Sequence, residues 1–285
     1  MKLTEEIKLK KLRATVLCEN CVFFNIGAIA EHGWSVYLET EYGNFLFDTG
    51  QGMAIINNAQ YFRKDLTKIK GIILSHHHHD HTGGLLKVLE YTGKVKVFAH
   101  PDLFKNSYNI RKGLEKNIGI PFRREVLEDK GADFMFNSEF TEIVPGLMLS
   151  GEVPRKTSFE KGDPDLVLKG EKGYQQDIVI DDQTLIVNTI RGLVIILGCS
   201  HSGIINIINY AMEKTGQQHI YALLGGTHLG PASEKTKSES IKALKKLDIE
   251  KIGTSHCTGL ETSMRLFQEF GKHFFFCHVG TEVKL

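Results

Sequence analysis

Three stretches near the start of the chain alternate apolar and polar residues, a period that is typical of β-strands with one buried face. They cover residues 14–17, 35–40 and 44–47, and Tyr42-Gly43 offers a turn between the last two. Such closely spaced strands joined by a short turn pair most simply with their sequence neighbours. The pattern therefore predicts a β-meander.

From residue 71 onward the pattern changes to short, continuous apolar runs, which are typical of strands buried on both faces. These runs cover residues 71–74, 193–197, 221–224 and 251–254. Apolar residues then recur at helical spacing in three places: Ile204, Ile205, Ile208 and Met212; Ile241, Leu244 and Leu247; Met264, Phe267 and Phe270. We interpret these stripes as core packing and expect residues 274–276 to form a buried strand. The alternation predicts an α/β chain.

The pattern is least regular between residues 101 and 172, where charged stretches, scattered glycines and a Pro154-Arg155 turn interrupt it. We interpret this segment as an insertion or cap over a functional site. Residues 1–285 are expected to form a single domain with that cap, because the chain is long enough for one large core and has no low-complexity linker.

The charge balance argues against some classes of partner. The 35 basic residues nearly cancel the 34 acidic ones, and basic residues do not gather in a patch interleaved with aromatic residues, so we expect no nucleic-acid partner. The first thirteen residues are charged and lack the apolar core of a signal peptide, and nowhere do eighteen apolar residues follow one another. We therefore expect a cytoplasmic protein without a membrane partner, and the sequence leaves the oligomeric state open.

The five cysteines are expected to be reduced thiols, since they are odd in number and too sparse for a disulfide framework. Cys18 and Cys21 form a C-x-x-C pair. No second pair and no thioredoxin-like context accompany them, so we assign them a structural role.

The most informative segment follows the apolar run 71–74 and reads Ser-His-His-His-His-Asp-His-Thr-Gly-Gly over residues 75–84. In an extended loop, side chains two positions apart point the same way, so His76 and His78 can approach one metal ion together. Asp80 and His81 lie where the loop turns into the next helix. Imidazole and carboxylate ligands favour Zn²⁺, as one or two ions, with Mn²⁺, Fe²⁺ or Mg²⁺ as alternatives, although Mg²⁺ prefers oxygen ligands.

The intervening histidines have a different expected role. His77 and His79 point away from His76 and His78 under the same alternation. We expect them to support the ligands or to face solvent.

Three further histidines follow the other apolar runs: His201 in Gly-Cys-Ser-His, His228 in Gly-Gly-Thr-His and His256 in Ser-His-Cys. The ends of strands are where α/β folds gather functional residues. Three histidines in equivalent places, beside a histidine-rich loop, are best explained by convergence on one site.

Several of these motifs resemble those of the metallo-β-lactamase superfamily: Ser-His-x-His-x-Asp-His-x-Gly-Gly, the upstream Phe47-Asp48-Thr49-Gly50, and the later His201 and His256. Other segments resemble a narrower branch, the dihydropterin synthases of methanopterin-type pathways, long described only as metal-dependent hydrolases. These segments are residues 31–33, 198–204, 226–229 and 256–259. The resemblance runs from about residue 14 to about residue 260.

This resemblance implies a four-layer αββα sandwich with metals in a cleft at one edge of the two sheets. It also implies that His76, His78 and His201 hold one ion and that Asp80, His81 and His256 hold the other. Asp48 would support the histidine loop from behind. The chain departs from the common pattern at residues 226–228, where Gly-Thr-His replaces a metal-bridging aspartate.

Residues outside the metal set are expected to act on substrate. For His228 three roles are open: a metal ligand, a general acid for the leaving group, or a substrate contact. We favour a catalytic or substrate role. Arg155 offers a bidentate phosphate contact from the cap, and His32 and Thr227 are further candidate substrate contacts.

Two reactions are compatible with this site. The first is hydrolysis of a small phosphorylated or ester substrate, because a metal lowers the pKa of bound water to about 7 and Asp80 can orient that water as the acid-base residue. The second, implied by the branch, is a synthase that grips the diphosphate of a pterin while an aminobenzene ribosyl phosphate attacks. Both predict a small, anionic substrate, and fold alone does not separate them.

Overall fold

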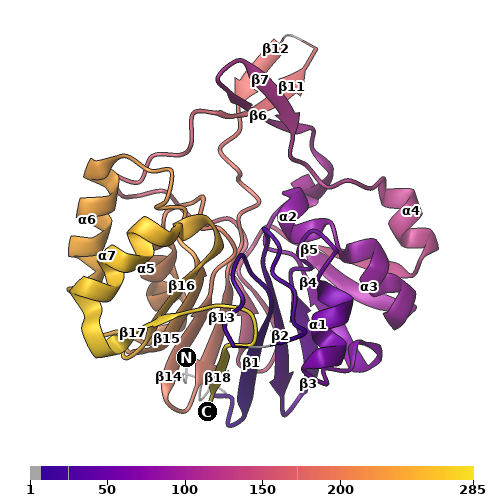
Figure 1. The fold of residues 1–285 in the computed structure, drawn as a ribbon, viewed down its shortest axis with the longest axis horizontal. Helices are drawn as coiled ribbons and strands as arrows, with labels where there is room; N and C mark the ends of the chain where they lie inside the picture. Colours follow the sequence, from indigo (N-terminus) through magenta and orange to yellow (C-terminus); the bar gives the residue numbers. More distant parts are fainter. Residues whose placement is uncertain (1–7, 25, 172) are drawn as a thin grey trace, which may run out of the picture.

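The computed structural model of the chain describes residues 8–24, 26–171 and 173–285. Two seven-stranded sheets pack face to face, and helices cover the outer face of each (Figure 1). A small four-stranded sheet projects from one end of this sandwich, at the top of Figure 1. The architecture is the four-layer αββα arrangement that the motifs implied.

The first sheet begins with the predicted meander. Its strands, in spatial order, are β18 (Glu282–Lys284), β1 (Leu12–Cys18), β2 (Ser35–Thr40), β3 (Gly43–Phe47), β4 (Ile69–Ile73), β5 (Val95–Ala99) and β8 (Ala132–Phe136). Strands β1 to β3 pair antiparallel with their sequence neighbours, whereas β3, β4, β5 and β8 run parallel. The meander and the buried strand at residues 71–74 are confirmed.

The second sheet contains the other predicted buried strands. Its spatial order is β17 (Phe274–Phe276), β16 (Ile252–Ser255), β15 (Ile220–Gly226), β14 (Gly192–Ile196), β13 (Leu185–Thr189), β10 (Leu147–Leu149) and β9 (Thr141–Val144). Strands β14 to β17 are parallel and correspond to the apolar runs. The expectation for residues 274–276 is confirmed as the edge strand β17, of which Phe274 is buried.

The main core lies between the two sheets. Inward-facing residues of the first sheet and its loops, such as Trp34, Phe45 and Phe47, pack against Leu185 and Val194 of the second. All five are at most 2 % exposed. Because burial of a large apolar side chain is worth roughly 1.5–3 kcal/mol, this layer holds the two sheets together.

The helices complete the two outer layers. The first sheet is covered by α1 (Ile55–Tyr61), α3 (Leu85–Thr92) and α4 (Arg124–Asp129), and the second by α5 (Ile204–Thr215), α6 (Glu234–Leu244) and α7 (Leu260–Phe270). The three predicted apolar stripes fall on α5, α6 and α7, and those of α5 and α6 pack on the core as expected. In α7 the residues that pack on the core are Leu266 and Phe270, whereas Met264 and Phe267 are exposed, so the core-packing prediction is wrong for these two. The remaining short elements are α2 (His79–Thr82), η1 (Leu66–Lys68), η2 (Pro101–Phe104), η3 (His256–Thr258) and η4 (Gly271–His273).

The segment 101–172 is divided between the sandwich and the projecting sheet. Strand β8 extends the first sheet and β9 and β10 extend the second, so residues 132–149 belong to the sandwich. The projecting sheet consists of β12 (Gly173–Gln176), β11 (Leu166–Gly170), β6 (Ser107–Arg111) and β7 (Leu114–Asn117), all antiparallel. What projects is therefore two hairpins distant in sequence, and not the continuous stretch that we expected.

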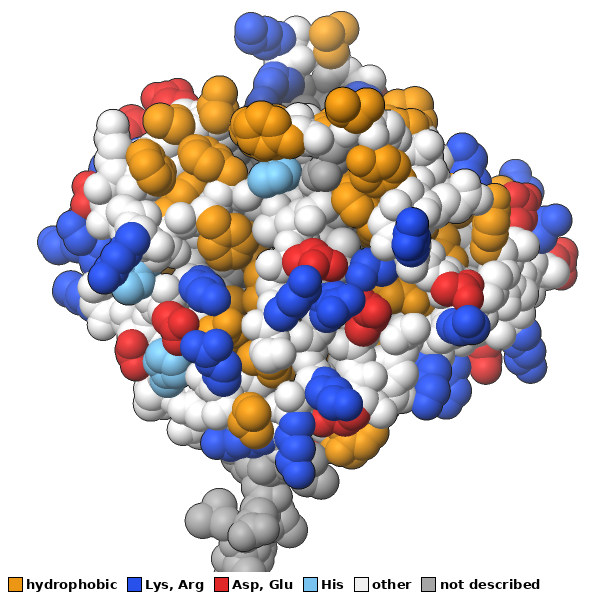
Figure 2. Space-filling view, turned by 60° about the horizontal axis from the view of Figure 1, so that its bottom comes forward, with side chains coloured by type: hydrophobic (Ala, Val, Ile, Leu, Met, Phe, Trp, Pro, Cys, Tyr) orange, Lys and Arg blue, Asp and Glu red, His pale blue; other side chains and the backbone are white. Residues whose placement is uncertain are grey.

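None of the helices in the described part of the chain has both the length and the apolar character that crossing a bilayer requires. On the face drawn in Figure 2, lysine and arginine side chains lie among acidic and apolar ones. This mixing accords with the near-neutral net charge.

Candidate metal centre

The loops that follow five strands meet at one edge of the sandwich, beneath the projecting sheet. Asp48 follows β3, the histidine loop follows β4, and Cys199 with His201 follows β14. His228 follows β15 and His256 follows β16. Asp48, Ser200, His228 and His256 all have positive φ angles between 51° and 63°, which non-glycine residues rarely adopt. Such strain is typical of residues that a functional site holds in place.

The histidine loop is fixed against the loop after β3 by backbone contacts. The amide and hydroxyl of Thr49 donate hydrogen bonds to the carbonyl of His81, at 2.7 and 2.8 Å. Gly84 allows this approach, because a Cβ there would lie 2.1 Å from the carbonyl oxygen of Thr49. The glycine pair that ends the loop is therefore needed for close packing.

One group of ligand atoms comes from His76, His78 and His201. One nitrogen of each ring lies within 4.8 Å of the others, and His76 Nε2 is 3.0 Å from His78 Nδ1. All three rings are buried. Burial and the neighbouring imidazoles hold the pKa of each histidine well below its usual 6.5, so the rings are neutral and have a free lone pair.

The other three predicted ligands, Asp80, His81 and His256, meet at His256. The compact groups of donor atoms that contain them are His32 with Asp80 and His256, and His81 with His76 and Cys199. His256 Nε2 lies 3.3 Å from His81 Nε2 and 3.2 Å from Asp80 Oδ2. Ligands of a tetrahedral zinc, each about 2.0–2.1 Å from the ion, lie roughly 3.3 Å apart. His32 joins Asp80 and His256 from a largely exposed position, with its Nε2 3.2 Å from the same Asp80 oxygen. Burial would raise the pKa of Asp80, but the hydrogen bonds from His256 and His32 hold it well below its usual value.

Asp48 orients His81 from behind. Its carboxylate accepts the backbone N–H and the hydroxyl of Ser75, both at 2.7 Å, and lies 2.7 Å from His81 Nδ1. Burial lowers the pKa of His81, but the adjacent Asp48 carboxylate outweighs this and raises it to about 9. The contact fixes His81 Nδ1 as the protonated nitrogen and turns Nε2 toward the cluster.

The chemistry of these atoms fits a bound cation. Buried His78 Nε2 and His201 Nε2 have no hydrogen-bond partner among the described residues. Leaving a buried polar atom unpaired costs about 1–3 kcal/mol, which a metal ion would offset. Nitrogen donors dominate and one carboxylate contributes, a set that suits transition metals.

The comparisons with known proteins agree with this geometry. A family model described as the metallo-beta-lactamase superfamily matches residues 29–256. The chain belongs to the metallo-β-lactamase superfamily.

Two relatives within this superfamily match nearly the whole chain. A 7,8-dihydropterin-6-methyl-4-(β-D-ribofuranosyl)-aminobenzene-5'-phosphate synthase of Methanocaldococcus jannaschii is 32 % identical and covers 97 % of this chain and 98 % of its own. A crystal structure described as a metal-dependent hydrolase of the β-lactamase superfamily is 30 % identical, with a TM-score of 0.81, and covers 96 % of this chain and 99 % of its own. An uncharacterized protein of M. jannaschii is 33 % identical over 88 % of this chain. The expectation of an enzyme of this superfamily and branch is confirmed.

The metallo-β-lactamase sandwich places the other sequence-predicted residues as follows. The His228 ring lies 4.2 Å from that of His201, centroid to centroid, and is tilted by 48° to it. His228 lines a pocket, and neither of its ring nitrogens has a hydrogen-bond partner among the described residues. Arg155 lines the same pocket, but two of its donors bind the backbone carbonyls of His201 and Ile178. Thr227 directs its hydroxyl to Thr258 Oγ1, 3.0 Å away, and does not line this pocket.

The two intervening histidines differ from each other. His77 is buried and bonds to Asp181, whereas His79 is half-buried and approaches the carbonyl of Ile118 at 3.4 Å. Both rings point away from the ligand group, as the alternation predicts, and His77 is held by a buried carboxylate whereas His79 is partly open to solvent.

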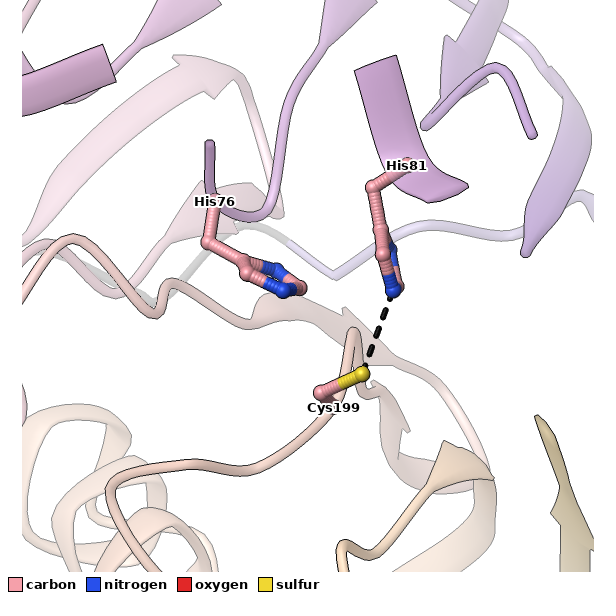
Figure 3. A group of neighbouring side chains, drawn as sticks. All are labelled: His76, His81 and Cys199. Atoms are coloured by element: carbon pink, nitrogen blue, oxygen red, sulfur yellow. Dashed lines mark hydrogen bonds between the residues drawn. The ribbon is translucent and has the colours of Figure 1, made fainter. Parts of the chain in front are cut away.

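Several residues near the centre escaped the sequence argument. Buried Glu31 accepts the backbone N–H groups of residues 51–54 with its two carboxylate oxygens, which fixes the loop before α1. Buried Glu19 accepts the backbone N–H of His256 at 2.8 Å. Cys199 Sγ lies 3.1 Å from His81 Nε2 (Figure 3), although the five cysteines, all free thiols, had been assigned no role in the site. Glu31 and Cys199 lie within the segments that resemble the narrower branch, at residues 31–33 and 198–204, which was the one signal for them; Glu19 belongs to no such segment.

A buried ion-pair network connects the histidine loop to the base of the projecting sheet. Asp181 accepts the backbone N–H of His77 at 2.8 Å and lies 2.8 Å from its Nδ1 and 2.7 Å from Lys105 Nζ. Asp177 lies 3.1 Å from the same ammonium and 3.4 Å from His77 Nε2. Lys105 precedes β6 and Asp177 follows β12, so both hairpins of the projecting sheet are anchored here.

This network predicts an acid-sensitive fold. Burial would raise the pKa of Asp181, but His77 and Lys105 outweigh it and lower the pKa below the usual value. A carboxylate whose pKa is lower in the folded state than in the unfolded state stabilises the fold fully above about pH 4. This stabilisation is lost as the pH falls through the folded-state pKa. Asp181→Asn is therefore expected to lower the free energy of unfolding at pH 7 by about 3 kcal/mol and to flatten its decline below pH 4.

Urea denaturation at pH 7, 5, 4 and 3 measures both effects. Asp133→Asn, which changes an exposed carboxylate on β8, serves as the control and should unfold like the parent protein. An Asp181→Asn protein with unchanged stability at pH 7 would show that the network contributes nothing to the fold.

Proposed function

We propose that this protein is a metal-dependent transferase that joins a pterin carrying a diphosphate to an aminobenzene ribosyl phosphate. The observation that carries the proposal is the presence of two pockets that each border the same ligand cluster. The first pocket is lined by His228, whose ring lies 4.2 Å from that of His201, and the second by His256, whose Nε2 lies 3.3 Å from His81 Nε2. Two substrates can therefore approach one metal centre together. The full-length likeness to a synthase of this type supports the same reading.

The metal is proposed to be Zn²⁺, as one or two ions, held by His76, His78 and His201 and by Asp80, His81 and His256, with Mn²⁺, Fe²⁺ or Mg²⁺ as alternatives. Neutral imidazoles that outnumber the carboxylate favour Zn²⁺ over Mg²⁺. When bound, such a cation acts as a Lewis acid that polarises phosphoryl oxygens and stabilises a departing anion.

The first pocket suits a phosphorylated group. It has a volume of about 630 Å³, and the side chains of Arg155, Lys161 and His228 line it. Burial lowers the pKa of His228, but the carboxylate of Asp163, 3.7 Å away, and the neighbouring Cys257 raise it to about 10. The ring also lines the pocket, and both of its nitrogens lack a hydrogen-bond partner among the described residues, so they are free to bind phosphate oxygens. We therefore assign His228 to substrate binding.

Arg155 helps to hold the wall of this pocket in place and can also contact a bound phosphate. Its bonds to the carbonyls of His201 and Ile178 fix the loop that carries His201. Since the guanidinium has five N–H donors, the remaining ones are available to a phosphate at the pocket wall.

The second pocket suits a flat ring. It has a volume of about 440 Å³ and is lined largely by apolar side chains, among them Phe23, Leu260 and Met264. Glu19 and Asn20 provide polar groups beside His256. Apolar walls with a few placed polar groups are typical of sites for heterocyclic ligands.

The proposed reaction exchanges one bond for another. The aminobenzene nitrogen attacks the pterin methyl carbon, a C–N bond forms, and the C–O bond to the diphosphate breaks. The proton of the attacking amine leaves with the diphosphate or passes to solvent. The chain's own contribution is to hold both substrates in line and to shield the site from water.

Hydrolysis is the second candidate, and the position of Asp80 favours it. His256 and His32 both contact one oxygen of Asp80, Oδ2, which leaves Oδ1 available to orient a water molecule. The 30 % identical structure described as a metal-dependent hydrolase also supports this reading. In that case water would take the place of the aminobenzene.

Product analysis distinguishes the two reactions. The metal-loaded protein is incubated with the pterin diphosphate, with and without the aminobenzene ribosyl phosphate, and products are identified by mass spectrometry. We expect a condensed product, with diphosphate released only when both substrates are present. Release at the same rate without the aminobenzene would make the protein a hydrolase.

The same assay tests the role of His228. We expect His228→Ala to retain its metal and to raise the KM for the pterin diphosphate about 10-fold or more, the effect of losing a charge-assisted contact of about 1.4 kcal/mol or more. Loss of metal from this variant would instead make His228 a ligand.

A further inference from the structure

The thiol of Cys199 lies inside the metal centre. Cys199 lies in the loop that follows β14 and is 3 % exposed. Its sulfur points toward His81, whose Nε2 is 3.1 Å away (Figure 3). His76 reaches the same place from the other side, and its ring nitrogen, that of His81 and the Cys199 sulfur lie within 4.8 Å of one another. The sulfur therefore faces donor atoms of both proposed ligand groups.

Two further sets of donor atoms include the same sulfur. One combines Cys199 with His201 and His228, and the other combines it with His256 and Cys257, again within 4.8 Å. Cys199 thus takes part in three of the candidate ligand groups found among the described residues. The Cys199 sulfur can therefore bind a metal ion held by either proposed ligand group, or lie between two such ions.

The loop opposite, residues 226–228, supplies no carboxylate donor. At Gly226 an added Cβ would lie 2.6 Å from both Cys257 Sγ and the carbonyl oxygen of Gly198, so this position accepts no side chain. Thr227 uses its hydroxyl on Thr258, and the ring of His228 lies beside Asp163. Residues 226–228 therefore leave the centre without a carboxylate from β15.

We propose that Cys199 is a metal ligand and binds as a thiolate between the two histidine groups. On binding, the S–H bond breaks, the sulfur–metal bond forms, and the proton passes to solvent, because a coordinating thiol is deprotonated by the cation. This proposal rests on the metal centre of the proposed function, and not on which reaction takes place there.

A sulfur ligand changes which metals the centre accepts. Thiolates are soft ligands that favour Zn²⁺ and Fe²⁺ over Mg²⁺ and Mn²⁺. The proposal therefore predicts that a large excess of Mg²⁺ leaves bound Zn²⁺ in place.

Cobalt substitution tests the ligand directly. Full-length protein is loaded with Co²⁺, the Co²⁺ content is measured by elemental analysis, and the near-ultraviolet sulfur-to-cobalt charge-transfer absorption is recorded. We expect the parent protein to show this absorption and Cys199→Ser to lose it. Cys18→Ser changes another buried thiol outside the centre and is expected to retain it.

The neighbouring Cys257 is the main alternative source of a sulfur ligand. If Cys257→Ser lost the absorption while Cys199→Ser retained it, the proposal would be overturned. Absence of the absorption from cobalt-loaded parent protein would overturn it as well.

A variant-free measurement covers the case in which Cys199→Ser does not fold. The ¹¹³Cd resonance of cadmium-loaded parent protein is expected in the downfield range of sulfur-ligated sites. A resonance in the range of purely nitrogen and oxygen ligands would contradict sulfur ligation. Neither spectrum depends on turnover, so a failed product assay leaves this test intact.

Discussion

Replacing His201 by alanine is expected to reduce turnover by well over 100-fold while leaving the fold intact. His201 supplies a neutral, buried ring nitrogen to the first ligand group, and its Nε2 has no hydrogen-bond partner in the part of the chain that the structure describes. Loss of a residue that merely supports a ligand costs about 10- to 100-fold, so loss of a ligand should cost more. Turnover is measured with the metal-loaded variant, and folding is checked by circular dichroism.

His219→Ala is the matched control for this substitution. His219 precedes β15 and pairs with Asp248 at 2.8 Å, at the far end of the strand from the metal centre. We expect its turnover to equal that of the parent protein. A His201→Ala protein with parental turnover would remove His201 from the site.

Asp48→Asn is expected to weaken metal binding by about 10- to 100-fold, the usual effect of losing a carboxylate behind a ligating histidine. The carboxylate lies 2.7 Å from His81 Nδ1 and accepts two hydrogen bonds from Ser75. An amide of the same shape can present an N–H to His81, which favours the wrong tautomer of that ring. The dissociation constant is measured by competition with a chelator.

Asp65→Asn provides the comparison for Asp48→Asn. Asp65 caps the short helix η1 by accepting the backbone N–H of Thr67, at a distance from the metal centre along the first sheet. We expect this variant to bind metal like the parent protein. Equal metal affinities for Asp48→Asn and the parent would mean that Asp48 does not orient His81.

The histidine cluster was predictable because its information is local. Alternation within one loop brings His76 and His78 together, and three parallel strands of one sheet bring His201, His228 and His256 to one edge. The meander and the helices α5 to α7 were predictable for the same reason, since each depends on a period within a short window.

The supporting residues were not predictable because their partners are distant in sequence. Asp181 contacts His77 across 104 positions, and Glu19 contacts His256 across 237. Neither carboxylate belongs to a motif, and the sequence alone does not distinguish a buried acidic residue from an exposed one. The projecting sheet was not predicted for the same reason. Its strand β6 pairs with β11, and the strands β8, β9 and β10 that lie between them in sequence belong to the sandwich.

Roles that depend on which way a side chain points were also beyond the sequence. Arg155 was expected to make a bidentate contact with phosphate, yet two of its N–H groups donate to the backbone carbonyls of His201 and Ile178. Thr227 was expected to contact substrate, yet its hydroxyl turns to Thr258. Cys199 was treated as an ordinary thiol, yet its sulfur lies beside His81. Spacing along the chain gives no information about these orientations.

The central claim is that this edge of the sandwich holds a catalytic metal, and elemental analysis of protein purified without added metal tests it most directly. The account predicts one to two transition-metal ions per chain, fewer in His201→Ala, and loss of turnover when a chelator removes them. Protein that is folded, fully active and free of divalent metal would contradict it.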